Sequence, residues 1–202
     1  MKYIFTIVIM FCALTATAEN APPSDGGKAL ATATFAGGCF WSMTAAFDKE
    51  EGVTKVMAGY TGGTGENPTY GDYEEKGHIE AVEVIFDPSR VSYEKLLDTF
   101  WHHVNPTDSG GQFCDRGPQY RPVIFYHNEE QKIAAEKSKA ELNNARRYKQ
   151  PITVEILSAS VFYPAEEYHQ GYYKKNSVQY NLYRIGCGRD WYLEKVWGKQ
   201  SH

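Results

Sequence analysis

The sequence predicts an α+β fold, because of the order of its predicted elements and the alternation in its clearest strand. Over the first two thirds of the chain, the spacing of the apolar residues indicates elements in the order strand, helix, strand, strand, helix, strand. This order is that of the split β-α-β arrangement of ferredoxin-like folds. The 202 residues suffice for one domain with a substantial core, and 15 Tyr and 10 Phe can help to fill it.

Four elements fill the first part of the chain. We expect a strand at Ala31–Ala36, a helix from Cys39 to about Gly52, and strands at Val53–Tyr60 and Ile79–Phe86. Between the last two strands the sequence TGGTGENPTYGDY is rich in Gly and Pro, which predicts a long shaped loop. Loops of that length in a domain often carry function.

Further helices and strands are predicted after these, and the last part of the chain has no hydrophobic periodicity. We expect a helix at Ser92–Val104, a polar loop at Asn105–Tyr120, a strand at Arg121–Tyr126, a helix from Asn128 to about Arg147, a strand at Ile152–Leu157 and a short helix within Phe162–Lys175. The remainder, to His202, is aromatic and basic and is predicted to wrap the core as a largely irregular tail. The expected architecture is a sheet with helices packed on it.

The N-terminal segment has the pattern of a secretory signal. Residues 1–18 combine a Lys, an apolar stretch too short to span a bilayer and the small-residue site Ala-Thr-Ala. An uncleaved anchor is the alternative, and the polar linker that follows argues against it. Cleavage would leave a linker at 19–30 and a single domain at 31–202, in a protein that is periplasmic if the source is Gram-negative and secreted otherwise.

Charge and composition limit the partners. The net charge of −4 gives no electrostatic case for nucleic acid or for an anionic membrane surface. No membrane association is expected after cleavage, and a monomer is expected. His102 and His103 are adjacent on a predicted helix and point about 100° apart, so they do not predict a metal site. No bound metal or cofactor is expected.

Three cysteines remain after cleavage, namely Cys39, Cys114 and Cys187. An odd number leaves at least one thiol free or paired outside the chain. Widely separated cysteines do not resemble a disulfide scaffold, which favours redox or nucleophilic chemistry.

Cys39 follows Gly37 and Gly38 and opens a helix in the sequence TFAGGCFW. Backbone N–H groups and the positive end of the helix dipole at that position favour thiolate and lower the pKa of a cysteine from about 8.5. The alternative is a small buried hydrophobe behind a plain strand-to-helix turn. On this pattern alone both interpretations stay open.

Glu80 lies at the start of the clearest strand, and alternation places it on the same face as Val82, Val84 and Phe86. If that face is buried, desolvation raises the pKa of Glu80, which could then hold a proton near neutral pH as a general acid requires. The alternative is a carboxylate at a frayed strand end that reaches solvent.

Five motifs occur in order over nearly the whole mature chain: GGCFW (37–41), GYTGG (59–63), GHIEAVEVIFDP (77–88), DRGPQYR (115–121) and FYPAEEYHQ (162–170). Together they resemble methionine sulfoxide reductase A. The resemblance implies a two-layer α/β sandwich with a ferredoxin-like core, which agrees with the element order. It also implies reduction of the S epimer of methionine sulfoxide, free and in proteins, as repair after oxidative damage. Ser42 departs from the commonest motif, which has Gly after the Trp.

The resemblance also implies residue roles: Cys39 is the nucleophile, Phe40 and Trp41 form the apolar pocket for the S-methyl group, and Glu80, Tyr60, Tyr120 and Asp115 form the polar side of the site. Such a set suits the chemistry, because a sulfoxide oxygen leaves poorly unless it is protonated. Protonated Glu80 can supply that proton, and the two tyrosine hydroxyls can hold the oxygen.

The same chemistry requires a second thiol. Loss of methionine leaves Cys39 as a sulfenic acid, which condenses with another thiol to form a disulfide. The resemblance implies that Cys187 is this resolving thiol, with Cys114 as a rival. It further implies an external dithiol reductant, thioredoxin or a thioredoxin-like protein.

Two other functional classes compete with this interpretation. A cysteine hydrolase would pair Cys39 with one of the histidines His78, His102, His103 or His169. A non-catalytic secreted binding module would use the Tyr-rich loops for docking and leave Cys39 unreactive.

Overall fold

A six-stranded sheet forms the centre of the molecule in the computed structural model, which describes residues 29–199. The predicted signal segment and nearly all of the predicted linker lie outside the described residues. The strands are β1 (Ala31–Ala36), β2 (Val53–Thr61), β3 (Ile79–Phe86), β6 (Val123–Tyr126), β7 (Glu155–Ser158) and β8 (Tyr163–Pro164), and a separate small ribbon joins β4 (Gly111–Gln112) to β5 (Asp115–Arg116).

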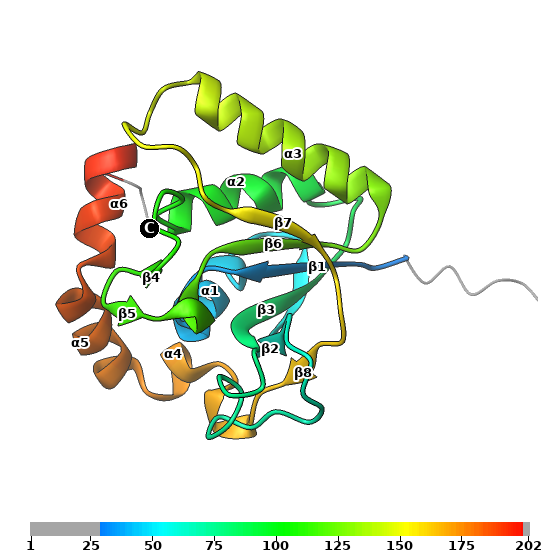
Figure 1. The fold of residues 1–202 in the computed structure, drawn as a ribbon, viewed down its shortest axis with the longest axis vertical. Helices are drawn as coiled ribbons and strands as arrows, with labels where there is room; N and C mark the ends of the chain where they lie inside the picture. The colour runs from blue at the N-terminus through cyan, green and yellow to red at the C-terminus, as the bar shows by residue number, and fades with distance from the viewer. Residues whose placement is uncertain (1–28, 200–202) are drawn as a thin grey trace, which may run out of the picture.

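The strand order β7-β6-β1-β3-β2-β8 confirms the predicted α+β class with a ferredoxin-like core (Figure 1). Strand β3 lies between β1 and β2 and runs antiparallel to both, as the split β-α-β arrangement requires. Strand β6 adds antiparallel to β1, and β7 joins β6 in parallel. The register of β2 and β3 places Tyr60 opposite Glu80.

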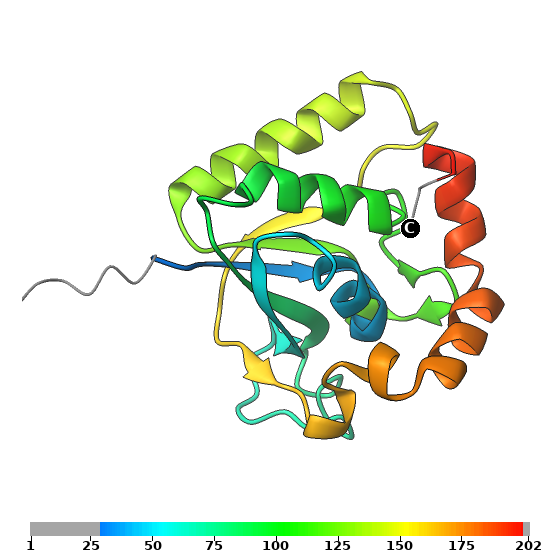
Figure 2. The same ribbon diagram turned by 180° about the vertical axis from the view of Figure 1, so that it is seen from behind.

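Helices α1 (Phe40–Phe47), α2 (Tyr93–His103) and α3 (Glu129–Asn144) accompany the sheet, as Figure 2 shows from behind. Side-chain caps stabilise the start of two of them: the Ser92 side chain accepts from the Lys95 N–H, and the Asn128 side chain accepts from the Gln131 N–H. The first helix ends at Phe47, which is earlier than predicted.

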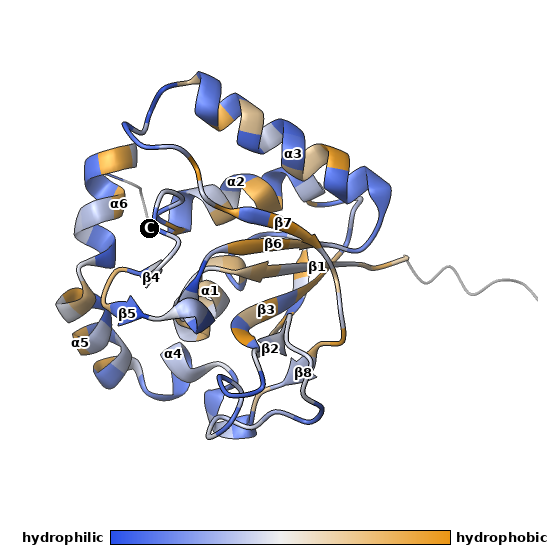
Figure 3. Cartoon of the chain, in the orientation of Figure 1, coloured by the Kyte–Doolittle hydropathy of each residue, from blue (hydrophilic) through white to orange (hydrophobic). Residues whose placement is uncertain are grey.

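The main core lies between the sheet and helices α1 and α2. Its members include Phe35 from β1, Phe47 from α1 and Phe100 from α2. The Phe35 ring stacks on the rings of Phe47 and Phe100, with centroids 4.8 and 5.5 Å away. A smaller cluster around Phe125 covers the other face of the sheet. Figure 3 shows the corresponding contrast between apolar β1 and the largely hydrophilic α3. The layers are therefore one sheet and one set of helices.

The C-terminal tail corrects the prediction of an irregular segment. It forms α5 (Ser177–Cys187) and α6 (Arg189–Trp197). The predicted short helix within Phe162–Lys175 is present as α4 (Tyr172–Lys175), which follows β8 and a single turn of 3-10 helix, η2 (Glu167–His169). Gly188 has a φ of 71° and ends α5 in the left-handed conformation that glycine favours. These helices lie along one end of the sheet, beside the β4–β5 ribbon (Figure 1).

Candidate active site

Cys39 is the N-cap residue of α1, at the turn between β1 and that helix. Gly38 has a φ of 80°, and a Cβ on Gly37 would lie 2.6 Å from the Met43 sulfur, so both positions require glycine. The Cys39 side chain is 7% exposed, and within residues 29–199 it is the free cysteine. The turn thus holds one thiol in a nearly closed site.

The ionisation of Cys39 is opposite to the effect of the helix N-terminus alone. Its pKa is raised well above the ordinary value, first by burial and then by the carboxyl groups of Glu80 and Asp115. Hydrogen bonds from the Trp41 backbone and the Tyr183 hydroxyl favour the thiolate but do not outweigh these causes. The helix N-terminus is present as predicted, yet Cys39 is a thiol in the resting protein.

Glu80 is buried, which decides between the two interpretations of its strand position. It is 2% exposed, and its pKa is raised to about 8 by burial, although hydrogen bonds from Phe40 and Tyr73 oppose the shift. The Phe40 N–H donates to one carboxyl oxygen at 2.9 Å, and the Tyr73 hydroxyl donates to the other at 3.3 Å. Glu80 therefore carries a proton at neutral pH beside the first turn of the Cys39 helix.

A tyrosine cluster lies against Glu80. The rings of Tyr60 and Tyr73 stack with centroids 4.8 Å apart, and the hydroxyls of Tyr73 and Tyr120 are hydrogen-bonded to each other. The Tyr60 hydroxyl, however, donates to Glu166 at 2.8 Å. Tyr73 thus bonds to Glu80 directly and Tyr120 reaches it through Tyr73, whereas Tyr60 packs beside Tyr73 with its hydroxyl turned to another carboxylate.

Asp115 links Cys39 to the C-terminal helices. Its carboxylate accepts from the Cys39 backbone N–H and, at 2.5 Å, from the Tyr183 hydroxyl on α5. Burial raises the pKa of Asp115, and these hydrogen bonds oppose the shift. Tyr183 donates to Asp115 and lies beside the Cys39 thiol, so α5 contributes directly to the site.

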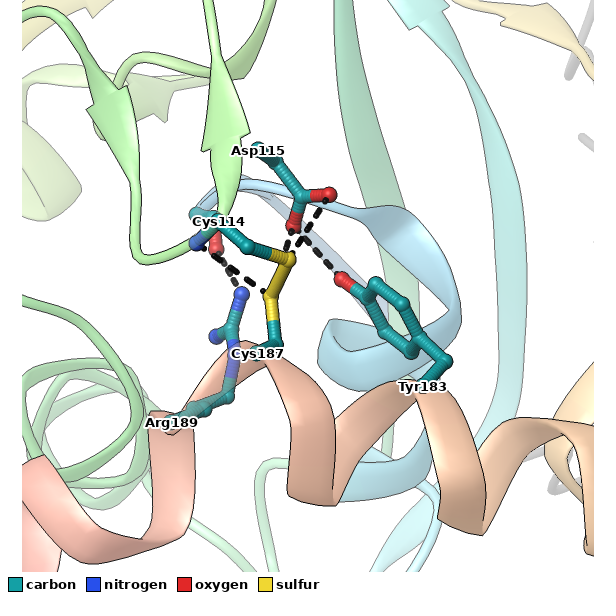
Figure 4. Close-up of a disulfide and its surroundings, with 6 residues drawn as sticks. Cys114, Asp115, Tyr183, Cys187 and Arg189 are labelled. Atoms are coloured by element: carbon teal, nitrogen blue, oxygen red, sulfur yellow. Dashed lines mark hydrogen bonds between the residues drawn. A yellow bond between two sulfur atoms is a disulfide. The ribbon is translucent and has the colours of Figure 1, made fainter.

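Cys114 and Cys187 form a disulfide with each other, with their Cα atoms 4.8 Å apart. Both sulfurs contact the Asp115 carboxylate, at 3.8 and 3.9 Å, as Figure 4 shows. The two candidates for the resolving thiol are thus bonded to each other, and Asp115 touches both this pair and the backbone of Cys39. Cys187 ends a helix and does not lie in an irregular tail.

Phe40, Trp41 and His169 form an apolar wall beside Cys39. The His169 ring lies 4.9 Å from Phe40 and 5.8 Å from Trp41, and Trp41 stacks on Tyr172 at 3.8 Å. The indole N–H of Trp41 donates to His169 Nδ1 at 3.1 Å, which leaves the imidazole proton on Nε2. Burial lowers the pKa of His169, so the ring is neutral.

Arg189 is a buried cation that fixes this end of the molecule. It is 1% exposed, donates to the carbonyls of His103 and Gly37 at 2.8 and 3.1 Å, and lies 4.4 Å from the Phe113 ring. It follows Cys187 by two residues and binds the turn that carries Cys39. The guanidinium therefore joins the disulfide segment to the nucleophile's own turn.

Sequence reasoning did not identify Tyr73, Glu166, Tyr183 or Arg189 as site residues. Tyr73 sits in the long loop that was expected to carry function, and Glu166 sits within the FYPAEEYHQ motif. The other two lie in the tail whose helices were not predicted. The structure brings the predicted site residues together. Tyr60 is among them, but its hydroxyl donates to Glu166.

The four histidines of the hydrolase hypothesis have other partners. His78 bonds to the Gly65 carbonyl, His102 and His103 bond to carbonyls of their own helix, and His169 accepts from Trp41. Buried thiol, protonated carboxyl and adjacent disulfide together define a thiol-dependent oxidoreductase.

Comparisons with known proteins agree with this class. A family model described as peptide methionine sulfoxide reductase matches residues 31–201. The chain is 54% identical to the peptide methionine sulfoxide reductase MsrA of Bacillus licheniformis over 83% of this chain and 94% of that one. It is 52% identical to the protein of that name from Listeria monocytogenes, over 84% and 97%.

Solved structures give the same answer. The methionine sulfoxide reductase A of Corynebacterium diphtheriae aligns with a TM-score of 0.64 at 30% identity, over 75% of this chain and 77% of that one. The reduced form of Mxr1 from Saccharomyces cerevisiae aligns with a TM-score of 0.64 at 28% identity, over 73% and 86%.

The chain belongs to the peptide methionine sulfoxide reductase A family. It is an enzyme that reduces methionine sulfoxide, which overturns the non-catalytic hypothesis. Among residues 29–199, no helix combines the length and the apolar character needed to cross a membrane.

Proposed function

We propose that the enzyme reduces the S epimer of methionine sulfoxide, free and in proteins, with Cys39 as nucleophile and Glu80 as general acid. The observation that carries this proposal is the hydrogen bond from the Phe40 N–H to Glu80. This hydrogen bond holds the protonated carboxyl of Glu80 at Phe40, the residue that follows Cys39. The sulfoxide oxygen can therefore receive a proton as Cys39 attacks the sulfur.

The first step balances as a two-electron transfer. The Cys39 thiol and the sulfoxide become a Cys39 sulfenic acid and methionine, with the oxygen moving from one sulfur to the other. Glu80 gives its proton to that oxygen and takes up the proton that leaves the thiol. The Tyr120 and Tyr73 hydroxyls stabilise charge on the oxygen, and Phe40 and Trp41 accept the methyl group.

Reset uses the cysteine pair in its reduced form. The Cys187 thiol attacks the Cys39 sulfenic acid, which releases water and forms a Cys39–Cys187 disulfide. Cys114 then attacks Cys187, which frees Cys39 as thiol and leaves the Cys114–Cys187 disulfide. This order is supported by exposure, since Cys187 is half-buried beside Asp115 whereas Cys114 is exposed.

The cycle ends when an external dithiol, thioredoxin or a thioredoxin-like protein, reduces the Cys114–Cys187 pair. The described fold has one domain, and we propose that it acts as a monomer. The signal pattern in residues 1–18 supports export, to the periplasm in a Gram-negative source.

The test is turnover of each sulfoxide epimer with dithiothreitol, using wild type beside Cys39→Ser. We expect wild type to consume the S epimer and the variant to be inactive. Activity in Cys39→Ser would refute the nucleophile, and equal rates for both epimers would refute the stereochemistry.

A further inference from the structure

Cys114, Asp115 and Cys187 bring three metal-ligating groups together at the edge of the active site. Within residues 29–199 they are the only three side chains of Cys, His, Asp or Glu whose ligand atoms all lie within 4.8 Å of one another. Cys114 and Asp115 come from the β4–β5 ribbon, and Cys187 ends α5. The two cysteines are 73 positions apart, so no spacing motif in the sequence indicates this cluster.

The distances in the cluster suit a tetrahedral metal ion once the disulfide is reduced. One Asp115 oxygen lies 3.8 Å from Cys114 Sγ, and the other lies 3.9 Å from Cys187 Sγ, as Figure 4 shows. A tetrahedral Zn²⁺ ion, with bonds of about 2.3 Å to sulfur and about 2.0 Å to oxygen, holds a sulfur and an oxygen about 3.5 Å apart. The carboxylate is therefore already close to its ligating distance, and the change that binding requires is separation of the two sulfurs to about 3.8 Å.

The surroundings of the cysteines leave room for that separation. Cys114 is exposed in the turn between β4 and β5, and Cys187 is half-buried at the end of its helix. A Cβ on Gly186 or Gly188 would have no atom within 4 Å, so the backbone on both sides of Cys187 faces open space. The same space admits an ion and a water molecule as the fourth ligand.

Hydrogen bonds and charge around the cluster favour a bound cation. The Cys114 N–H donates to Cys187 Sγ at 3.2 Å, and the Tyr183 hydroxyl donates to Asp115 at 2.5 Å. Donors of this kind stabilise and orient the ligands of a metal site. Two thiolates, one carboxylate and a divalent cation leave one negative charge, and the buried guanidinium of Arg189, which acts on Asp115, offsets it.

We propose that Cys114, Cys187 and Asp115 bind Zn²⁺ when the cysteine pair is reduced. Two thiolates and one carboxylate are ligands that zinc takes, and water completes the tetrahedron. The oxidised pair does not bind the ion, because thiolate is the form of cysteine that ligates metals. The site therefore exists in only one of the two redox states of the pair.

Bound zinc would keep the pair from resetting Cys39. Zn²⁺ takes the place of two thiol protons, which pass to solvent, and nothing is oxidised or reduced in the exchange. The Cys187 thiolate then shares its electron pair with the metal, so its attack on the Cys39 sulfenic acid is slower. This consequence rests on the proposed function, whereas binding of the ion does not.

The binding test uses Co²⁺ as a coloured substitute for zinc on the full chain. Protein reduced with a phosphine is freed of the reductant without air and titrated with Co²⁺. We expect one equivalent to produce visible bands of tetrahedral cobalt, and Zn²⁺ to abolish them because it binds such ligands more tightly. Wild type with titratable thiols and no such bands would overturn the proposal. Oxidised wild type should show none, and equal bands there would also overturn it.

Variants identify the ligands. Cys187→Ser and Asp115→Asn should each weaken zinc binding at least tenfold, measured by competition with Co²⁺. Cys39→Ser removes a thiol outside the cluster and should bind as wild type does. The matched carboxylate control is Asp190→Asn, three residues after Cys187, because Asp190 pairs with Arg184 and should not affect binding. Wild-type affinity in Asp115→Asn, or loss of the bands in Cys39→Ser, would show that the ion binds elsewhere.

A single turnover separates the metal site from the proposed function. Reduced protein, with and without one equivalent of Zn²⁺, receives one equivalent of the S epimer, and mass spectrometry follows the Cys114–Cys187 disulfide. We expect zinc to slow formation of this disulfide at least tenfold, and equal rates would refute the effect of zinc on reset. Metal-free protein that forms neither methionine nor the disulfide refutes the proposed function, while the Co²⁺ titration still decides whether the site binds metal.

Discussion

Replacing Glu80 by Gln separates the two consequences of burying a carboxyl group. Gln has nearly the shape of protonated Glu and keeps an oxygen to accept from the Phe40 N–H or the Tyr73 hydroxyl. It loses the acidic proton and the ability to become charged. We therefore expect activity to fall and stability to rise.

The stability change follows from the pKa of Glu80, which burial raises from 4.5 to about 8. Between these values the folded protein keeps a proton that the unfolded chain has released, so stability falls as pH rises and becomes constant above about 8. At about 1.4 kcal/mol per pH unit, this lowers wild-type stability by about 3 kcal/mol at pH 7. Glu80→Gln removes the effect, so its Tm should exceed that of wild type by several degrees at pH 7 and match it near pH 4.5.

The activity change is measured in a single turnover. Reduced enzyme is mixed with one equivalent of methionine sulfoxide and quenched, and loss of the general acid should slow methionine formation about a hundredfold, or about 2.7 kcal/mol of barrier. Glu75→Gln, at an exposed carboxylate in the preceding loop, should change neither quantity. A Tm difference that does not vary with pH, or an unchanged single-turnover rate, would refute the reasoning.

The remaining predictions concern the thiols and the residues that hold them. Cys114→Ser should accumulate the Cys39–Cys187 disulfide after one turnover, seen by mass spectrometry as the loss of two hydrogens and a single cross-linked peptide pair; a stable sulfenic acid would contradict the proposed order. Tyr183→Phe removes a donor that favours the Cys39 thiolate, so iodoacetamide should alkylate Cys39 more slowly at pH 8, and a faster reaction would show that access controls the rate. Arg189→Met should lower stability by about 2 to 4 kcal/mol in urea unfolding, because two buried carbonyls lose their donors; an unchanged midpoint would deny the guanidinium this role.

Strand alternation predicted the central fold and placed Glu80 on an apolar face, while it left the burial of that face open. In β3 a two-residue repeat places Glu80 on the face of Val82 and Val84, and that face is buried. The element order then fixed the neighbours of β3, since the split arrangement has few alternatives. Both alternation and element order can be read from residues that are close together in the sequence.

The tail could not be predicted in the same way, because α5 has two different stripes. Tyr180, Tyr183 and Cys187 face the protein, while Leu182 and Ile185 face solvent. The helix has a one-sided apolar pattern, but its apolar stripe of Val178, Leu182 and Ile185 faces solvent, so the pattern does not indicate the face that packs on the protein. The helix was therefore missed, and with it the pairing of Cys187 with Cys114.

The ionisation of Cys39 also lay beyond the local pattern. A helix N-terminus is visible in the sequence and favours thiolate. The groups that outweigh it are the surrounding core and the carboxyl groups of Glu80 and Asp115, which are distant in the chain. Only the folded arrangement shows which of these opposing effects is larger.

Helix α5 joins the two halves of the proposed cycle. Its inner face brings Tyr183 to the Cys39 thiol and to Asp115, and its last residue is Cys187. Reduction of the disulfide therefore acts on the same short helix that completes the site of Cys39. Arg189, two residues after Cys187, donates to the carbonyls of Gly37 and His103, so the segment that carries the disulfide is bonded directly to the turn that carries the nucleophile.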